Sequence, residues 1–291
     1  MYGRVKIHLA SICPIALTAL FLGCIMQISI KIPVDASTTK KGGEVSRNLK
    51  GDGSKSLLRL TGEMAKSCTT REIGDSVFYH RFLFRDMVAH AVSLSLNNAR
   101  FVVKPIVAET RATTSSLTIN SEALAGINGG YFNSEKNPIE HVGLLKTNGK
   151  LEEPASHSVY RDSERYFMSR GAFGVTYSGN ADIAWCSTKN DSIFEWERPL
   201  TNRPGYPSDS LPFSSANYWD VRDALHAGPV LISDGEIDLN IEDEVFFNTP
   251  VAGVQPRSAI GYTKDQHLVL MVVDGRQAES RGVYLEELAL M

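Results

Sequence analysis

The chain has 291 residues, of which 43% are hydrophobic and 22% are charged, with a formal net charge of -3 and a pI near 6.2. These proportions are ordinary for a globular protein and exclude a disordered or collagen-like chain. A slight acidic excess argues against a nucleic-acid-binding protein, which usually carries a strong basic excess. We therefore expect no nucleic acid among the partners.

Residues 1–36 have the pattern of an export segment. Arg4 and Lys6 precede an apolar run from Leu9 to Ile30, which Lys31 closes. A basic start followed by such a run is typical of a signal peptide, and about 20 apolar residues also suffice to span a bilayer. The small-residue stretch Val34-Asp35-Ala36 offers a cleavage site. We predict an exported protein, secreted or anchored in a membrane only through this segment, and both outcomes stay open.

Residues 37–74 are polar and rich in Lys, Gly, Ser and Thr, which predicts a flexible linker before a folded domain over 75–291. Cys68 and Cys186 are the two cysteines outside the export segment. In an exported chain they are candidates for one disulfide or for two separate thiols. Because there is no CxxC spacing and no histidine cluster, we expect no metal site and no cofactor.

Strand signals dominate the predicted domain. Alternating or β-branched runs predict strands over 87–96, 101–108, 172–177, 183–186 and 229–233. Asn148-Gly149 predicts a type I′ hairpin turn, and Lys264-Asp265-Gln266 a second hairpin between strands 258–263 and 267–273. Helical patterns are few: one turn over 121–125 and an amphipathic helix over 284–291, with Leu285, Leu288 and Ala289 on one side. The pattern predicts a single α+β domain, strand-rich, with a mixed sheet and few helices.

Four glycine-marked junctions follow apolar strands. Paired glycines allow positive φ and bring backbone N–H groups close to an anion. The junctions place Asn128, Arg257, Asp274 and Arg276 at strand ends, where polar site residues are commonly held. They read INGGYF (127–132), AGPVLI (227–232), QPRSAIGY (255–262) and VVDGRQ (272–277).

The ordered motifs INGGYF, AGPVLI, PRSAIGY, VVDGRQ and GVYLEELA resemble the phosphodiester glycosidase family, over about residues 90–291. The resemblance implies an exported hydrolase that cleaves the sugar–phosphate bond of sugar-1-phosphodiesters, such as those of surface, exopolysaccharide or cell-wall glycans. Two features depart from the family pattern. Tyr284 stands where a capping Ser or Thr is usual, and the sequence stops at Met291, before an Asn-Leu-Asp-Gly-Gly-Gly-Ser-type loop. We therefore expect the C-terminal part of the domain to be missing from this chain.

The implied reaction needs fixed cations and N–H dipoles more than an acid, because a phosphate monoester is already a good leaving group. Arginine binds phosphate oxygens bidentately. We therefore predict that Arg257 binds the phosphate with help from Asn128 and the Gly129-Gly130 backbone, and that Arg276 is a second candidate. Asp274 is predicted to activate water or to stabilise the oxocarbenium-like centre, and Glu279 is the reserve carboxylate.

Each role has a structural alternative. Arg257 can be an ion-pair partner, Asp274 can bond backbone N–H groups in a turn, and Asn128 can occupy a left-handed turn. The acids of 234–244 alternate with Ile and Leu, as on a solvated strand face, and lack the spacing of a calcium loop. Histidines including His90, His141 and His226 show no ligand spacing. The alternative function is a non-catalytic protein that binds anionic glycans or assists exopolysaccharide assembly.

Overall fold

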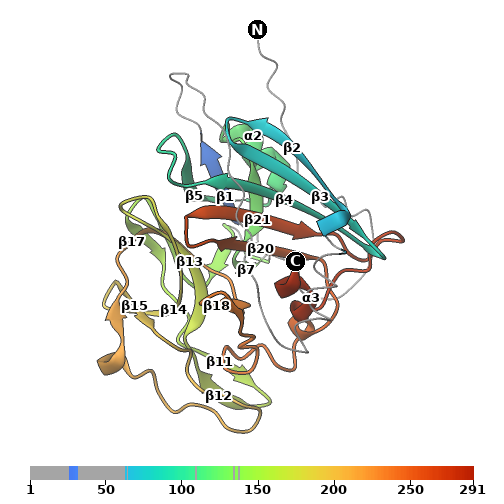
Figure 1. Ribbon diagram of the computed structural model, residues 1–291. Helices are drawn as coiled ribbons and strands as arrows, with labels where there is room; N and C mark the ends of the chain where they lie inside the picture. The colour runs from blue at the N-terminus through green and yellow to red at the C-terminus, as the bar shows by residue number, and fades with distance from the viewer. Residues whose placement is uncertain (1–25, 32–62, 64, 109, 134, 137) are drawn as a thin grey trace.

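The computed structural model describes residues 26–31 (backbone only), 63, 65–108, 110–133, 135–136 and 138–291. Within these residues the protein consists of three antiparallel sheets, three short two-stranded hairpins and a few short helices (Figure 1). The prediction of a strand-rich single domain with few helices is confirmed. The expected mixed sheet is not found, because every strand pairing in the described residues is antiparallel. A mostly-β description therefore fits better than α+β.

The five-stranded sheet carries most of the predicted site residues. Its order is β2 (Cys68–Gly74), β3 (Val77–Phe84), β4 (Met87–Ser95), β21 (His267–Val273) and β20 (Arg257–Tyr262). The β20–β21 hairpin is the one predicted around Lys264-Asp265-Gln266. Strand β2 lies within the predicted linker, whose residues up to 62 are outside the described part, so the sheet begins before the expected boundary at residue 75.

The second sheet has seven strands. Their order is β10 (Lys150–Glu153), β9 (Leu145–Thr147), β17 (Val221–His226), β13 (Arg170–Thr176), β14 (Ala181–Lys189), β15 (Ser192–Trp196) and β16 (Asn217–Tyr218). The β9–β10 turn is the predicted Asn148-Gly149 hairpin. Both turn residues have positive φ, 51° and 82°, as a type I′ turn requires.

The remaining elements are short. A three-stranded sheet has the order β5 (Val102–Val107), β1 (Met26–Lys31) and β6 (Gly126–Gly129). The hairpins are β7 (Tyr131–Asn133) with β8 (Glu140–Val142), β11 (Ser158–Arg161) with β12 (Glu164–Phe167), and β18 (Ile232–Ser233) with β19 (Glu236–Ile237). The helices are α2 (Thr114–Asn120), α3 (Leu285–Leu290) and the 3-10 turns η1 (Phe213–Ser215) and η2 (Pro250–Ala252).

Strand β1 forms from the end of the apolar run that was predicted as an export segment. It pairs on one side with β5 and on the other with β6. The rest of that segment, residues 1–25 and 32–36, lies outside the described residues. In the described part of the chain no helix is long and apolar enough to cross a bilayer.

One apolar core joins all the layers. Its side chains come from the five-stranded sheet, the seven-stranded sheet and the β5–β6 region, and include Val92, Leu270, Phe173, Val175, Val103 and Ile127. A second cluster covers the opposite face of the five-stranded sheet, where α3 packs through Leu288 against Ala91 and Val273. The five-stranded sheet is therefore buried on both faces over much of its length.

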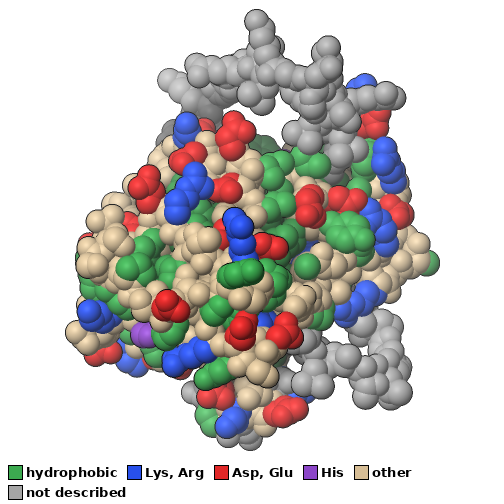
Figure 2. All heavy atoms as spheres, turned by 90° about the horizontal axis from the view of Figure 1, so that it is seen from below, with side chains coloured by type: hydrophobic (Ala, Val, Ile, Leu, Met, Phe, Trp, Pro, Cys, Tyr) green, Lys and Arg blue, Asp and Glu red, His purple; other side chains and the backbone are tan. Residues whose placement is uncertain are grey.

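The surface of the molecule that is seen from below carries acidic and basic side chains intermixed (Figure 2).

The two helices differ in how well the sequence predicted them. The predicted helix over 284–291 is confirmed as α3, with Leu285, Leu288 and Ala289 buried. The Glu287 carboxylate accepts from the backbone N–H of the N-cap residue Tyr284 at 2.9 Å, as the acidic residue of a capping box does. The helical turn predicted over 121–125 was misplaced, because Thr113 caps the Ser116 N–H at 3.1 Å and starts α2 earlier.

Candidate functional site

A row of polar residues crosses one face of the five-stranded sheet near the end of β21. Ser258 of β20 lies opposite Val272 of β21, Val272 lies opposite His90 of β4, and His90 lies opposite Arg81 of β3. Residues directly opposite each other on paired strands share a face. Ser258, His90 and Arg81 therefore form one line across the strands, which we call the polar row.

Asn128 joins this row from the neighbouring sheet. The hydroxyl of Ser258 donates a hydrogen bond of 2.6 Å to its amide oxygen, and both residues are exposed. Beyond Asn128, the chain turns at Gly130 with φ of 64° before it enters β7. The Asn128-Gly129-Gly130 turn thus borders the polar row, as the prediction of a substrate-binding turn requires, but its binding role stays a prediction.

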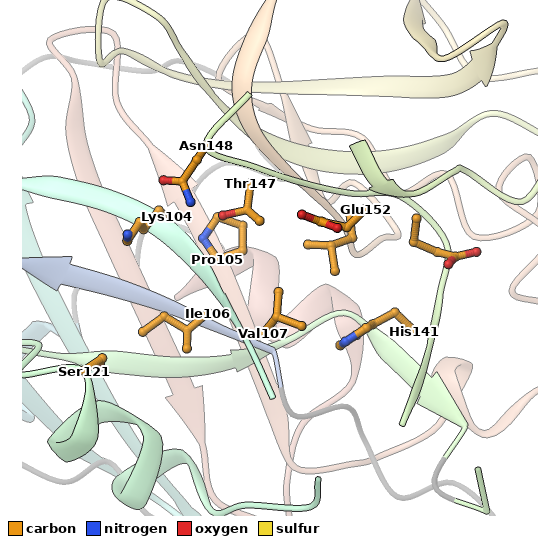
Figure 3. A pocket seen from close by; sticks show the side chains of 11 residues that line it. Lys104, Pro105, Ile106, Val107, Ser121, His141, Thr147, Asn148 and Glu152 are labelled. Atoms are coloured by element: carbon orange, nitrogen blue, oxygen red, sulfur yellow. The ribbon is translucent and has the colours of Figure 1, made fainter. Parts of the chain in front are cut away.

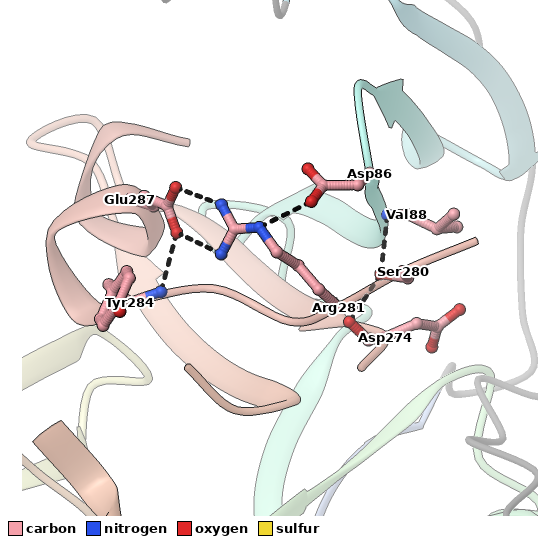
Figure 4. A network of polar contacts seen from close by, with 7 residues as sticks. All are labelled: Asp86, Val88, Asp274, Ser280, Arg281, Tyr284 and Glu287. Atoms are coloured by element: carbon pink, nitrogen blue, oxygen red, sulfur yellow. Dashed lines mark hydrogen bonds and ion pairs between the residues drawn. The ribbon is translucent and has the colours of Figure 1, made fainter. Parts of the chain in front are cut away.

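Asp274, the first residue after β21, is fixed by its backbone (Figure 4). Its N–H donates to the Val88 carbonyl at 2.9 Å, and its carbonyl accepts from the Ser280 hydroxyl at 2.7 Å. Ser280 is fully buried and also accepts from the Val88 N–H at 3.0 Å. These bonds clamp the backbone of Asp274 to β4 while its carboxylate remains about one fifth exposed.

The Asp274 carboxylate faces the imidazole of His90. Nε2 of His90 lies 3.5 Å from Oδ2 of Asp274, and Nδ1 of His90 lies 2.6 Å from the hydroxyl of Tyr79. Burial raises the pKa of Tyr79, the charges of Arg81 and Arg71 lower it, and that of Asp274 raises it. A carboxylate, an imidazole and a phenol therefore form a continuous chain. His90 was missed as a site residue because a strand pattern does not reveal which strand lies beside it.

Arg257 points away from this chain of residues. It lies opposite Val273, which is completely buried under α3, so strand alternation places Arg257 on the other face from Ser258. Its Nη2 donates to the carbonyls of Val251, at 2.7 Å, and Gly253, and its Nε donates to the Val283 carbonyl at 3.3 Å. Burial lowers the pKa of Arg257, against the charges of Tyr131 and Glu286. The guanidinium thus ties the η2 turn to the segment before α3.

Arg276, the second candidate for the phosphate, and Glu279, the reserve carboxylate, are both exposed. Arg276 is exposed, has φ of 60°, and donates from Nη2 to the side-chain oxygen of Gln255. Glu279 is exposed in the turn between Gln277 and Ser280 and makes no hydrogen bond or ion pair with the described residues. Neither residue makes a hydrogen bond or an ion pair with the Asp274 carboxylate, and the roles predicted for both stay predictions.

The AGPVLI motif packs against a buried carboxylate. Glu244 is completely buried and accepts hydrogen bonds from the N–H groups of Gly171 at 2.8 Å and Val230 at 2.7 Å, and from the indole of Trp185 at 2.9 Å. A Cβ on Gly228, whose φ is 84°, would lie 2.5 Å from Glu244 Oε2. The glycine of this motif is therefore needed for close approach. Burial raises the pKa of Glu244 against the three hydrogen bonds, which lower it.

Cys68 and Cys186 are separate thiols and do not form the disulfide that the sequence left open as an alternative. Cys186 is buried, with Sγ 3.5 Å from Nε2 of His226. Burial raises the pKa of the Cys186 thiol, and burial together with the charge of Arg170 lowers the pKa of His226 to about 3. The pair is therefore neutral and inert at neutral pH. The described residues contain no group of His, Cys, Asp and Glu side chains suited to a metal ion.

A pocket of about 590 Å³ lies apart from the polar row, between β5 and the β9–β10 hairpin (Figure 3). Its wall combines apolar groups of β5 with Lys104, Thr147, Glu152 and the imidazole of His141. Both ring nitrogens of His141 are buried and lack a hydrogen-bond partner among the described residues, and burial lowers its pKa. Asp274 and Asn128 do not line this pocket.

The fold and the site thus define an antiparallel β protein that presents a carboxylate beside an imidazole at a strand end, a pairing suited to acid–base chemistry. The phosphodiester glycosidase family model matches residues 121–291, more than half of the chain. The chain therefore belongs to the phosphodiester glycosidase family, and the resemblance seen in its motifs is confirmed.

Two solved structures are similar to this chain. The catalytic domain of zebrafish N-acetylglucosamine-1-phosphodiester alpha-N-acetylglucosaminidase, auto-inhibited by its pro-peptide, is 17% identical, with 77% of this chain and 70% of that chain covered and a TM-score of 0.42. A Burkholderia pseudomallei protein described as a candidate exported protein is 14% identical, with 70% and 65% covered and a TM-score of 0.38. No curated protein matches the sequence. The assignment therefore rests on the family match.

Proposed function

We propose that this protein is an exported hydrolase that cleaves the bond between the anomeric carbon of a sugar and its phosphate in a sugar-1-phosphodiester, with surface or cell-wall glycans as the substrate class. Membership of the phosphodiester glycosidase family supports the reaction type. Export is proposed from the basic and apolar N-terminal pattern. The observation that carries the site is the Asp274 carboxylate, clamped at a strand end beside His90 and on the face where Asn128 is bound.

In the proposed step, a water oxygen bonds to the anomeric carbon while the bond from that carbon to the phosphate oxygen breaks. The phosphate monoester leaves with the bonding electrons, and the proton of the attacking water passes to the Asp274 carboxylate. His90 lies against Asp274 and Tyr79, so it fixes the direction of the carboxylate. Asn128 and the Gly129-Gly130 turn bind the substrate where they border the polar row.

The test compares Asp274→Asn with Asp265→Asn in the same chain. Asp265 is exposed in the hairpin turn at the other end of β21, so the control removes the same charge from the same strand pair. The assay measures release of reducing sugar from a UDP-sugar or a chromogenic sugar phosphodiester. We expect Asp274→Asn to lower kcat/KM by about 100-fold or more, a typical effect of losing a general base. Asp265→Asn should retain wild-type activity.

If Asp274→Asn stays within about threefold of wild type, Asp274 is not the general base, since such a loss is small beside the effect of a base. Saturable binding of the phosphodiester with no sugar released by the wild type would instead favour the non-catalytic glycan-binding function.

A further inference from the structure

Strands β2 and β3 carry two arginines on the same face as Asp274. Arg71 of β2 lies directly opposite Tyr79 of β3, and Arg81 lies two residues further along β3, opposite His90. Because side chains alternate along a strand, Arg71, Tyr79, Arg81 and His90 all project from one face. The two arginines are exposed, and Arg71 lies over the ring of Tyr79.

Neither arginine has a carboxylate partner among the described residues, in contrast to several other arginines. Arg100 pairs with Asp75, Arg222 with Asp223, and Arg281 with both Asp86 and Glu287. Arg71 is instead oriented by an aromatic ring, with its Cζ 5.6 Å from the centre of the Tyr79 ring. Two guanidinium groups on one face, with no acidic partner in the part of the chain that the structure describes, attract an anion.

The distance to the reaction centre suits one substrate molecule. Paired strands lie about 4.8 Å apart, so Arg81 stands one strand from His90. His90 in turn lies 3.5 Å from the Asp274 carboxylate. Strand β3 is two spacings, about 10 Å, from β21, so the long side chain of Arg81 can reach toward a phosphoryl group whose sugar lies at Asp274. Strand β2 is one spacing farther, so Arg71 approaches the same group from its outer side, next to Tyr79.

Arg257 cannot supply the same contact from its position. Its Nη2 and Nε are committed to three backbone carbonyls on the opposite face of the sheet. The phosphate monoester that leaves in the proposed reaction gains negative charge, which a planar guanidinium stabilises best. Arg71 and Arg81 meet that need on the face where Asp274 lies.

We propose that Arg71 and Arg81 form the phosphoryl subsite of this protein, on a part of the chain that precedes the 121–291 family match. This inference rests on the proposed function, since it places the phosphate of the same substrate. Arg81 binds the phosphoryl oxygens next to His90, and Arg71, held against the Tyr79 ring, closes the other side. As the bond to the anomeric carbon breaks, both guanidinium groups stabilise the departing monoester.

The experiment measures binding of inorganic phosphate to the full chain by isothermal titration calorimetry. The test variant is R71Q/R81Q, and the control is R165Q/R203Q, which removes two positive charges from exposed arginines outside the five-stranded sheet. Wild type and control should bind phosphate equally. The test variant should bind at least about tenfold more weakly, because hydrogen bonds to charged groups are the strong ones.

The subsite is overturned if R71Q/R81Q binds phosphate within about twofold of wild type. It is also overturned if test and control variants lose affinity equally, since neither result exceeds what the loss of two positive charges anywhere on the surface produces. So does a wild type that binds no phosphate. Asp274→Asn separates this result from the proposed function. Removing a nearby negative charge should leave phosphate binding unchanged or tighter, whatever happens to turnover. If Asp274→Asn keeps full turnover, the catalytic assignment fails while phosphate binding still decides the subsite.

Discussion

The buried carboxylate of Glu244 offers the sharpest test of the fold. Replacing Glu244 by Ala removes the acceptor of three hydrogen bonds and leaves the N–H groups of Gly171 and Val230 and the indole of Trp185 without a partner. A buried donor left unsatisfied costs about 1–3 kcal/mol, so the three together cost about 3–9 kcal/mol. Small domains are stable by about 5–15 kcal/mol, and Glu244→Ala should therefore bring the protein close to unfolding.

Glu244→Gln refines the magnitude. Oε1 accepts from both Val230 and Trp185, whereas Oε2 accepts only from Gly171. An amide with its oxygen at the Oε1 position keeps two of the three bonds and sets an NH₂ group against the Gly171 N–H. We therefore expect a loss of about 1–3 kcal/mol for Gln, well below the loss for Ala.

The assay is urea unfolding at pH 7, followed by tryptophan fluorescence. Glu242→Ala is the matched control, because Glu242 is an exposed carboxylate in the same segment. It should change the free energy of unfolding by less than about 0.5 kcal/mol. Equal stabilities for Glu244→Ala and Glu242→Ala, within about 1 kcal/mol, would refute the assignment of three buried hydrogen bonds to Glu244.

Two further outcomes follow from the described contacts. Arg257→Met should lower the free energy of unfolding by about 1–3 kcal/mol, because half-buried carbonyls lose their donor, and should leave phosphate affinity unchanged. Unchanged stability together with lost phosphate binding would instead show that Arg257 binds the phosphate. His226 has a folded pKa of about 3 and an unfolded value of 6.5, so its stabilisation is present above pH 6.5 and is lost as the pH falls toward 3. This loss amounts to at most about 5 kcal/mol in the free energy of unfolding. In His226→Asn the urea midpoint should therefore decrease less between pH 7 and pH 4 than in the wild type, and an equal decrease in both proteins would contradict this prediction.

Local signals in the sequence predicted local structure well. Asn148-Gly149 supplied the two positive φ values of a hairpin turn, and the spacing of Leu285, Leu288 and Ala289 gave the buried side of α3. Both features depend on residues that are close in sequence. The same holds for the β20–β21 hairpin, whose strands and turn are contiguous.

Features that depend on distant partners could not be predicted. Glu244 belongs to a run of acids that looked solvated, and it is buried because β13, β14 and the AGPVLI motif each bring one donor to it. Arg257 was predicted to bind the phosphate of the substrate on which Asp274 acts, but the register of β20 directs its side chain to the face opposite that of Ser258. His90 contacts Asp274 only because β4 and β21 pair, which the spacing of the two residues does not reveal.

The position of β1 bears on how the protein matures. Met26–Lys31 supplies the central strand between β5 and β6, yet it precedes the expected cleavage site at Val34-Asp35-Ala36. A peptidase that cut there and released the leader would expose the backbone N–H and C=O groups along both neighbouring strands, which invites another segment to pair with them. The same six residues cannot be both a discarded leader and a permanent strand. Sequencing the N-terminus of the mature protein distinguishes the two fates.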